Sequence, residues 1–308
     1  MSELGEKPLI NYNADGLQDR LLTAAALMVA GEMCLVLMGA SVRGLSAQLS
    51  IVQILFLRNV FGSLFAGFLV YRVDFKHLNK DKLGLHVAHS SFGVLAIFFL
   101  FYAFSTLKIT EATLMKASVP VFVSFVAWFV LRESLSLFVW LAILCAFLGV
   151  VIVVNPGAEM NAFSAAELAV CNGMLAGVAS IFLASAAVIT VRKLGATVKS
   201  EVVVFNFSVF GIVFTLPLAV YYWRPLAVEQ WMLMLLCALL AISGQFLITK
   251  AYSIATTGKV AMFSYCSMPL AGLVGWLFWQ EQITQQLLVG GLVIFCAGVM
   301  MVFSSSRR

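Results

Sequence analysis

The stretch Lys116–Pro120, Lys-Ala-Ser-Val-Pro, decides the fold because the chain contains a second version of it. The counterpart is Tyr265–Pro269, Tyr-Cys-Ser-Met-Pro, in which the serine and the proline recur 149 positions later. Three flanking motifs recur in the same order at an offset of 148 or 149 positions. They are Ala103–Ser105 with Ala251–Ser253, Leu131–Glu133 with Trp279–Glu281, and Leu148–Val151 with Ala297–Met300. Four ordered matches at a nearly constant offset indicate that one unit has been duplicated.

The amino-acid composition indicates that this chain folds in a membrane and not in water. Of the 308 residues, 62% are hydrophobic and 11% are charged, and the mean hydropathy is +1.03. Soluble domains are about 45–50% apolar and about 25% charged. The apolar surface is too large to be covered by polar groups in water. These values exclude a soluble globule, a disordered chain, a coiled coil and a nucleic-acid-binding protein, and they predict an all-α membrane protein.

Apolar segments recur along the chain at intervals of about 30 residues, and each is close to the roughly 20 residues that cross a bilayer as a helix. We therefore predict ten transmembrane helices, with residues 1–20 and 305–308 as polar tails. The expected spans are Leu21–Val42, Leu49–Tyr71, Leu83–Thr106, Thr110–Leu131, Leu137–Val154, Glu167–Val191, Val202–Trp223, Trp231–Tyr252, Lys259–Trp279 and Gln286–Ser304.

The distribution of Lys and Arg predicts the orientation, because cytoplasmic loops carry an excess of these residues. With a cytoplasmic N-terminus, 13 of the 19 Lys and Arg residues fall on the cytoplasmic side and three fall outside. The other three, Arg58, Lys116 and Lys250, lie within spans. Both tails are therefore expected in the cytoplasm, which requires an even number of spans.

Five spans per copy is an odd number, so the second copy must enter the membrane from the opposite face. The predicted architecture is two inverted five-helix repeats, residues 21–155 and 167–304, joined by an external linker at 156–166. Inverted repeats of this kind are typical of secondary transporters, whose substrate site lies near the midplane between the repeats.

These features together resemble a known group of proteins. Arg58 closes the motif Phe56–Arg58 in the second span, Pro120 and Pro269 lie within the fourth and ninth spans, and a glutamate, Glu133 or Glu281, follows each of those two spans. With ten spans arranged as five plus five, the chain resembles the drug/metabolite transporter superfamily, in particular its EamA-type members.

The resemblance covers about Leu21 to Ser304 and implies a fold and an activity. Spans one to four and six to nine would surround a central cavity, with spans five and ten at the periphery. Members of the superfamily transport amino acids, other metabolites, nucleotide sugars and drugs. Membership therefore implies transport but leaves the substrate and its direction open.

Three charged residues within the spans are the main site candidates, since each costs about 2.5–3.5 kcal/mol at the bilayer centre. Glu32 lies near mid-depth in the first span, in a context (Ala30–Glu32) similar to the small multidrug resistance proteins, in which this glutamate binds protons and cations. Arg58 remains protonated and needs an anion, which could be Glu32 or a substrate. Lys116 shares a polar helix face with Thr113 and is expected to face the cavity or to extend toward the outer surface.

The pairing of these charges affects the expected substrate. If Glu32 pairs with Arg58, Lys116 leaves one surplus positive charge, which favours a solute with a carboxylate or phosphate. Glu32 is also the candidate for proton coupling. His89, in the third span, is a second candidate for coupling, with a packed or solvated histidine as the alternative.

Further candidates for the cavity are neutral, and each has a structural alternative. Tyr265 is the repeat counterpart of Lys116, and Pro120 and Pro269 each free a backbone carbonyl where a helix could bend. For the aromatic side chains of Tyr102 and Phe98, packing or contact with lipid is the simpler explanation. For the side-chain amide of Gln245, contact between helices is the structural alternative. The remaining candidates for substrate contact are Tyr102, Phe98 and Gln245.

We therefore expect a secondary transporter of the plasma (inner) membrane, with a small metabolite such as an amino acid as substrate and the lipid bilayer as its surroundings. A proton-coupled exporter of cationic drugs through Glu32 and, more remotely, a membrane enzyme are the alternatives. The chain lacks GxSxG, HExxH and Walker motifs, so no enzyme activity, cofactor or metal is expected. A homodimer could form through peripheral span five or ten.

Overall fold

A computed structural model describes residues 14–71, 83–132, 134–154, 165–194, 200–254, 260 and 263–305. Within these ranges every regular element is a helix, which confirms the predicted all-α class. The elements are α1 Ala14–Ser46, α2 Ile51–Tyr71, α3 Leu83–Thr106, α4 Ile109–Leu131, α5 Leu137–Val154, α6 Ala165–Leu194, α7 Ser200–Tyr221, α8 Val228–Ile254, the 3-10 helix η3 Ser264–Cys266, α10 Ser267–Trp279 and α11 Gln285–Ser305.

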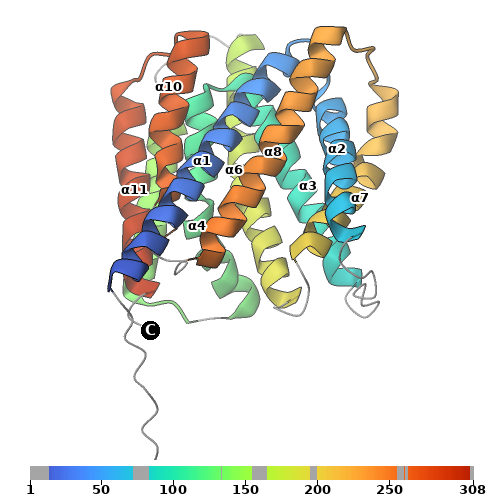
Figure 1. Cartoon of the computed structure of the whole chain (residues 1–308). Helices are drawn as coiled ribbons and strands as arrows, with labels where there is room; N and C mark the ends of the chain where they lie inside the picture. The colour runs from blue at the N-terminus through green and yellow to red at the C-terminus, as the bar shows by residue number, and fades with distance from the viewer. Residues whose placement is uncertain are drawn as a thin grey trace, which may run out of the picture.

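The helices stand side by side in one bundle (Figure 1). Helix α1 begins at the end of the bundle near which the C-terminus lies, and we call this the terminal end. The opposite end, where α1 leads into α2, α3 into α4 and α10 into α11, is called the distal end. Five helices are both long and apolar enough to cross a membrane, and four shorter apolar helices accompany them among the described residues. The chain is therefore an integral, multi-pass membrane protein.

The predicted spans agree closely with most of these helices, and two helices extend beyond their predicted spans. Helix α1 begins at Ala14, inside the predicted tail, because a helix can continue beyond the hydrocarbon into the interface. Helix α6 likewise begins at Ala165, at the end of the predicted linker. Residues 1–13, 155–164 and 306–308 lie outside the described residues.

The ninth span differs from its prediction. We expected Pro269 within a continuous helix, yet the backbone passes through η3 and α10 begins only at Ser267. Pro269 thus lies in the first turn of α10, where the missing N–H would have no helical partner. Pro120, in contrast, lies inside α4 as predicted. The two copies therefore differ in backbone geometry at their shared proline.

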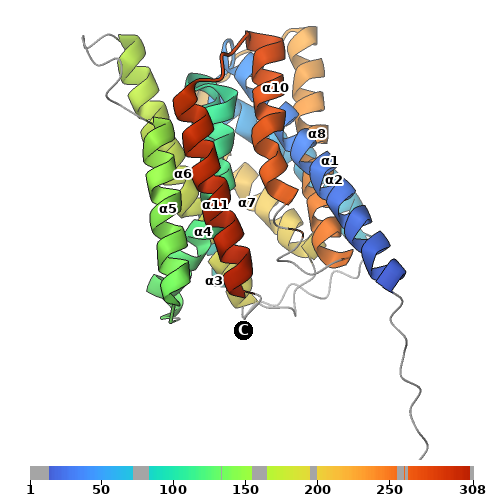
Figure 2. The ribbon, with the colours of Figure 1, turned by 90° about the vertical axis from the view of Figure 1, so that its left-hand side faces the viewer.

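The two halves of the chain interlock through pairs of helices. Helix α1 packs on α8, α3 on α6, α2 on α7 and α5 on α11. Figure 2 shows α5 and α11 adjacent along one side of the bundle. Both helices also expose large apolar side chains, including Leu144 and Leu292, as expected of surfaces in contact with lipid.

Glycines allow two of these helix pairs to approach closely. A Cβ added to Gly244 of α8 would lie 2.9 Å from the carbonyl oxygen of Gly31 in α1. A Cβ added to Gly290 of α11 would lie equally close, 2.9 Å, to the carbonyl oxygen of Gly149 in α5. Such small residues let helix backbones touch in membranes, where packing rather than water drives association.

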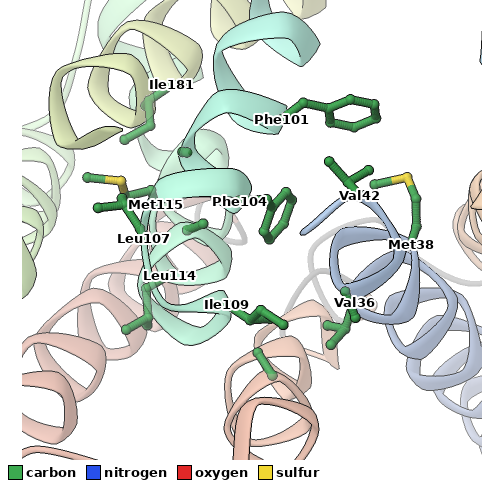
Figure 3. Close-up of a cluster of buried hydrophobic side chains, with 14 of the residues drawn as sticks. Val36, Met38, Val42, Phe101, Phe104, Leu107, Ile109, Leu114, Met115 and Ile181 are labelled. Atoms are coloured by element: carbon green, nitrogen blue, oxygen red, sulfur yellow. The ribbon is translucent and has the colours of Figure 1, made fainter. Parts of the chain in front are cut away.

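Figure 3 shows the part of the main hydrophobic core where α1, α3 and α4 meet. Phe104 of α3 is 1% exposed, and its ring occupies the space above Gly39 of α1, where a Cβ would approach the ring to 2.7 Å. Met115 of α4 similarly lies against Gly177 of α6. This core holds α4 in place, and α4 carries one of the candidate site residues.

The contact between α1 and α8 yields a test of the packing. Gly244→Ala should lower the stability of the folded state by about 1–3 kcal/mol, as overpacking does, because the new methyl group meets a backbone oxygen that cannot move alone. Thermal unfolding of the purified protein in detergent measures this. Gly84→Ala is the matched control, since nothing lies within 4 Å of its added Cβ. Equal unfolding midpoints for both variants would refute a close α1–α8 contact.

Candidate functional site

The structure joins two of the three charged candidates, Glu32 and Lys116. The ammonium nitrogen of Lys116 (α4) lies 2.8 Å from Oε2 of Glu32 (α1). The side chain of Glu32 is 8% exposed and that of Lys116 is 28% exposed. Glu32 therefore pairs with Lys116 and not with Arg58, for which the sequence had left Glu32 or a substrate open as the anion. The alternative interpretation was that Lys116 extends toward the outer surface. Its ammonium instead lies on Glu32 of α1.

Local packing explains why Glu32 faces α4. The preceding residue, Gly31, lies against Gly244 and Ile248 of α8. Successive residues on an α-helix point about 100° apart, so the side chain of Glu32 is directed away from the face that contacts α8. The α1–α8 contact thus orients the carboxylate toward Lys116.

Cys266 in η3 lies near this ion pair, and the sequence did not single it out. Its thiol lies within electrostatic range of both Glu32 and Lys116. Because η3 packs on α1, a residue of the second half of the chain lies near the ion pair. The cysteine gave no signal in the sequence, because it lies in an apolar run like the other five.

Arg58 occupies a separate position on α2. Within the part of the chain that the structure describes, no carboxylate lies at ion-pair distance from Arg58, and its buried Nε has no hydrogen-bond partner. The thiol of Cys237 in α8, which is fully buried, is within electrostatic range. The following residue, Asn59, is 1% exposed, and neither of its amide atoms has a partner. Because Glu32 pairs with Lys116, the surplus positive charge among the three candidates belongs to Arg58.

The neutral candidates are dispersed over the bundle. Tyr265 is 5% exposed, and its ring packs against Phe295 and Gly298 of α11. Phe98 packs edge-to-face on Phe99. Tyr102 is half-buried on α3 and Gln245 is exposed on α8.

His89 and the prolines have identifiable surroundings. Nδ1 of His89 lies 3.1 Å from the carbonyl oxygen of Ala187 in α6, and its ring lies against Phe207 of α7. These contacts are those of a packed histidine between helices. Pro120 and Pro269 are both exposed, and the hydroxyl of Ser124, one turn beyond Pro120 on α4, contacts the sulfur of Met301 in α11. Among the described residues no cluster of His, Cys, Asp or Glu could hold a metal ion.

The fold and this interior define a class: a helical, multi-pass membrane protein built from two related halves that retains charged groups between its helices. Comparison with known proteins supplies the family. The profile of the EamA-like transporter family matches residues 22–155 and again residues 172–304. The chain belongs to this family, within the drug/metabolite transporter superfamily, and the duplication predicted from its motifs agrees with the double match.

Curated relatives agree with this assignment. The chain is 26% identical to the pseudopaline exporter CntI of Pseudomonas aeruginosa, over 91% of this chain and 95% of that protein. It is 27% identical to the riboflavin transporter of Vibrio cholerae, over 65% of each chain. It is 24% identical to an S-adenosylmethionine uptake transporter of Rickettsia felis, over 85% of this chain and 86% of that one.

The fold is also present among solved structures. One crystal structure superposes with a TM-score of 0.61 and 16% sequence identity, covering 94% of this chain and 98% of that one. The relatives are named as transporters of small metabolites, which supports a transport function for this chain. Their names include both an exporter and uptake transporters, so the direction differs among them.

The ion pair gives a prediction for stability. Lys116→Met leaves the Glu32 carboxylate buried without a partner and should destabilise the protein by about 3–5 kcal/mol. The double variant Glu32→Gln with Lys116→Met removes both charges and should recover most of that loss. A double-mutant cycle on thermal unfolding measures the coupling. Additive effects of the two single changes would show that the groups do not interact.

Proposed function

We propose that this protein carries a small, carboxylate-bearing metabolite across the bacterial inner membrane by alternating access. The observation that carries the proposal is the charge balance of the interior. Glu32 and Lys116 neutralise each other, whereas Arg58 retains a positive charge without a carboxylate partner among the described residues. A carboxylate of the substrate would supply that partner, since a guanidinium in a membrane interior requires an anion.

The proposal includes an inverted arrangement of the two halves, ten spans and cytoplasmic termini. Three features support it. The two family matches begin within the first and the sixth predicted spans and each extends to the end of its half. The packing of α1 on α8 has its counterpart in α6 on α3 when the halves are exchanged. In Figure 2, α1 starts at the terminal end whereas α6 starts at the distal end. The excess of Lys and Arg in the sequence segments assigned to the cytoplasm supports a cytoplasmic position for the terminal end.

The alternative of a cation exporter through Glu32 fits the geometry less well. A cationic substrate would have to displace the ammonium of Lys116, which already lies 2.8 Å from the carboxylate. A membrane enzyme is disfavoured because the family and the named relatives are transporters. The suggestion that α5 or α11 forms a homodimer face remains a prediction.

Ligand binding tests the role of Arg58. Purified protein is screened by thermal shift against amino acids and organic acids, each paired with its methyl ester or amide. Binding to the folded state raises stability by about 2.7 kcal/mol at a hundred times Kd, so the acid should shift the unfolding midpoint and its neutral derivative should not. Arg58→Gln should weaken binding about 10–100-fold, because a hydrogen bond to a charged group contributes about 1.5–3 kcal/mol.

Lys193→Gln is the matched control for Arg58→Gln, because Lys193 is an exposed basic residue at the end of α6. It should bind the same ligands with unchanged affinity. Binding of an acid and its ester with equal affinity, or unaffected binding in Arg58→Gln, would remove the carboxylate from the proposal.

Proton coupling is tested separately at Glu32. Protonation of this carboxylate would release Lys116, so a proton gradient could drive the opening of the pair. Glu32→Gln in proteoliposomes should abolish accumulation driven by an imposed pH gradient while leaving counterflow exchange of the labelled substrate. A full response of this variant to the gradient would exclude Glu32 as the coupling group.

A further inference from the structure

The distal end of the bundle contains a second interior ion pair that the proposed function does not use. Arg43, at the end of α1, forms an ion pair with Glu281, which follows α10. Oε1 of Glu281 also accepts a hydrogen bond at 3.1 Å from the backbone N–H of Ile109, the first residue of α4. The hydroxyl of Thr110 lies 3.5 Å from Oε2. One carboxylate therefore joins the ends of three helices, α1, α4 and α10.

The backbone around Glu281 is shaped to hold this carboxylate in place. Gln280 has a φ of 53°, the left-handed conformation that ends many helices, and the N–H of Glu281 donates to the carbonyl of Gly275. The side chain folds back on α10, where a Cβ on Gly275 would lie 2.3 Å from Oε2. The guanidinium of Arg43 lies over the ring of Trp279, 5.0 Å from its centroid. The carboxylate is thus packed, and only 6% of its side chain is exposed.

Two physical effects strengthen the contact. The carboxylate meets the N-terminus of α4, where unpaired backbone N–H groups and the helix dipole favour a negative charge. The guanidinium is attracted both by the carboxylate and by the indole face. Polar groups elsewhere at the distal end add a second tie, because the side chain of Gln53 in α2 pairs with the backbone of Arg224, between α7 and α8.

We propose that Arg43, Trp279 and Glu281, with Ile109 and Thr110, form a latch that closes the extracellular end of the transport pathway and has to open before substrate can pass there. We call these five residues the distal latch. The inference rests on the proposed function and on its orientation, with the distal end outside. The latch joins Arg43 and α4, from the first half of the chain, to Glu281 of the second half, so the halves cannot separate at this end while it holds.

Thr113 offers a position that reports whether the latch is open. It lies one turn farther into α4 than Thr110, on the same face, and it is 1% exposed. A reagent arriving from outside reaches this position only when the distal end has opened. The test uses a chain in which all six cysteines are replaced and Thr113→Cys supplies the single thiol, labelled in intact cells by a membrane-impermeant maleimide.

While the latch is intact, the maleimide should label residue 113 slowly. Arg43→Gln, Glu281→Gln and Gly275→Ala should each raise the labelling rate at least about tenfold, which corresponds to a shift of about 1.4 kcal/mol toward the open state. Gly275→Ala retains both charges and acts only by displacing the carboxylate. Glu229→Gln is the matched control, because Glu229 is an exposed acidic residue at the same end of the bundle. It should leave the labelling rate unchanged.

The outcomes separate this proposal from the proposed function. Unchanged labelling in Arg43→Gln and Gly275→Ala would overturn the latch, whatever Arg58→Gln does to ligand binding in purified protein. Because the side chain of Arg43 is 24% exposed at a helix end, Arg43→Gln should fold even if Glu281→Gln does not. A rise of equal size in Glu229→Gln would also overturn it, since the effect would then follow from any lost surface charge.

Discussion

A charge within the hydrocarbon of a membrane must be balanced inside the protein, and this constraint organises the interior of the bundle. Glu32 is 6% exposed and is balanced by Lys116, so the pair holds α1 against α4. Either charge without the other would lower the stability of the folded protein substantially. Lys116 has a carboxylate partner and Arg58 has none among the described residues. We therefore propose that a ligand, rather than a side chain, balances the charge of Arg58.

Much of the fold could be predicted from the sequence, because the length of an apolar run and the polar residues that end it are local properties. The predicted spans Leu83–Thr106 and Leu137–Val154 coincide with α3 and α5 at both ends. The partner of Glu32 could not be predicted in this way. Depth along a helix gives the height of a residue but not its neighbours, and the direction of Glu32 depends on the contact of Gly31 with α8.

The repeat relates positions in the two halves of the sequence, but it does not fix the directions in which their side chains point. An offset of 149 relates Lys116 to Tyr265, yet Tyr265 packs on α11 and the neighbouring Cys266 lies near the ion pair. The cause is the local backbone, because a 3-10 helix turns by about 120° per residue rather than about 100°. Residues before Pro269 therefore point in directions that their counterparts in the continuous helix α4 do not. Equivalent places in a duplicated sequence are not always equivalent places in space.

The interior ion pair and the distal latch lie on the same helices, which gives them a mechanical relation. Glu32 and Arg43 are eleven residues apart on α1, which is about three turns and about 16 Å, so their side chains share one face. Lys116 and Ile109 are seven residues apart on α4, about two turns and about 10 Å. Both helices are continuous between these positions. A tilt of α1 relative to α4 that separates Glu32 from Lys116 therefore also displaces Arg43 relative to the start of α4, where Glu281 is held. Rigid helices can in this way link the protonation or occupancy of the interior to the closure of one end, without any direct contact between the two sites.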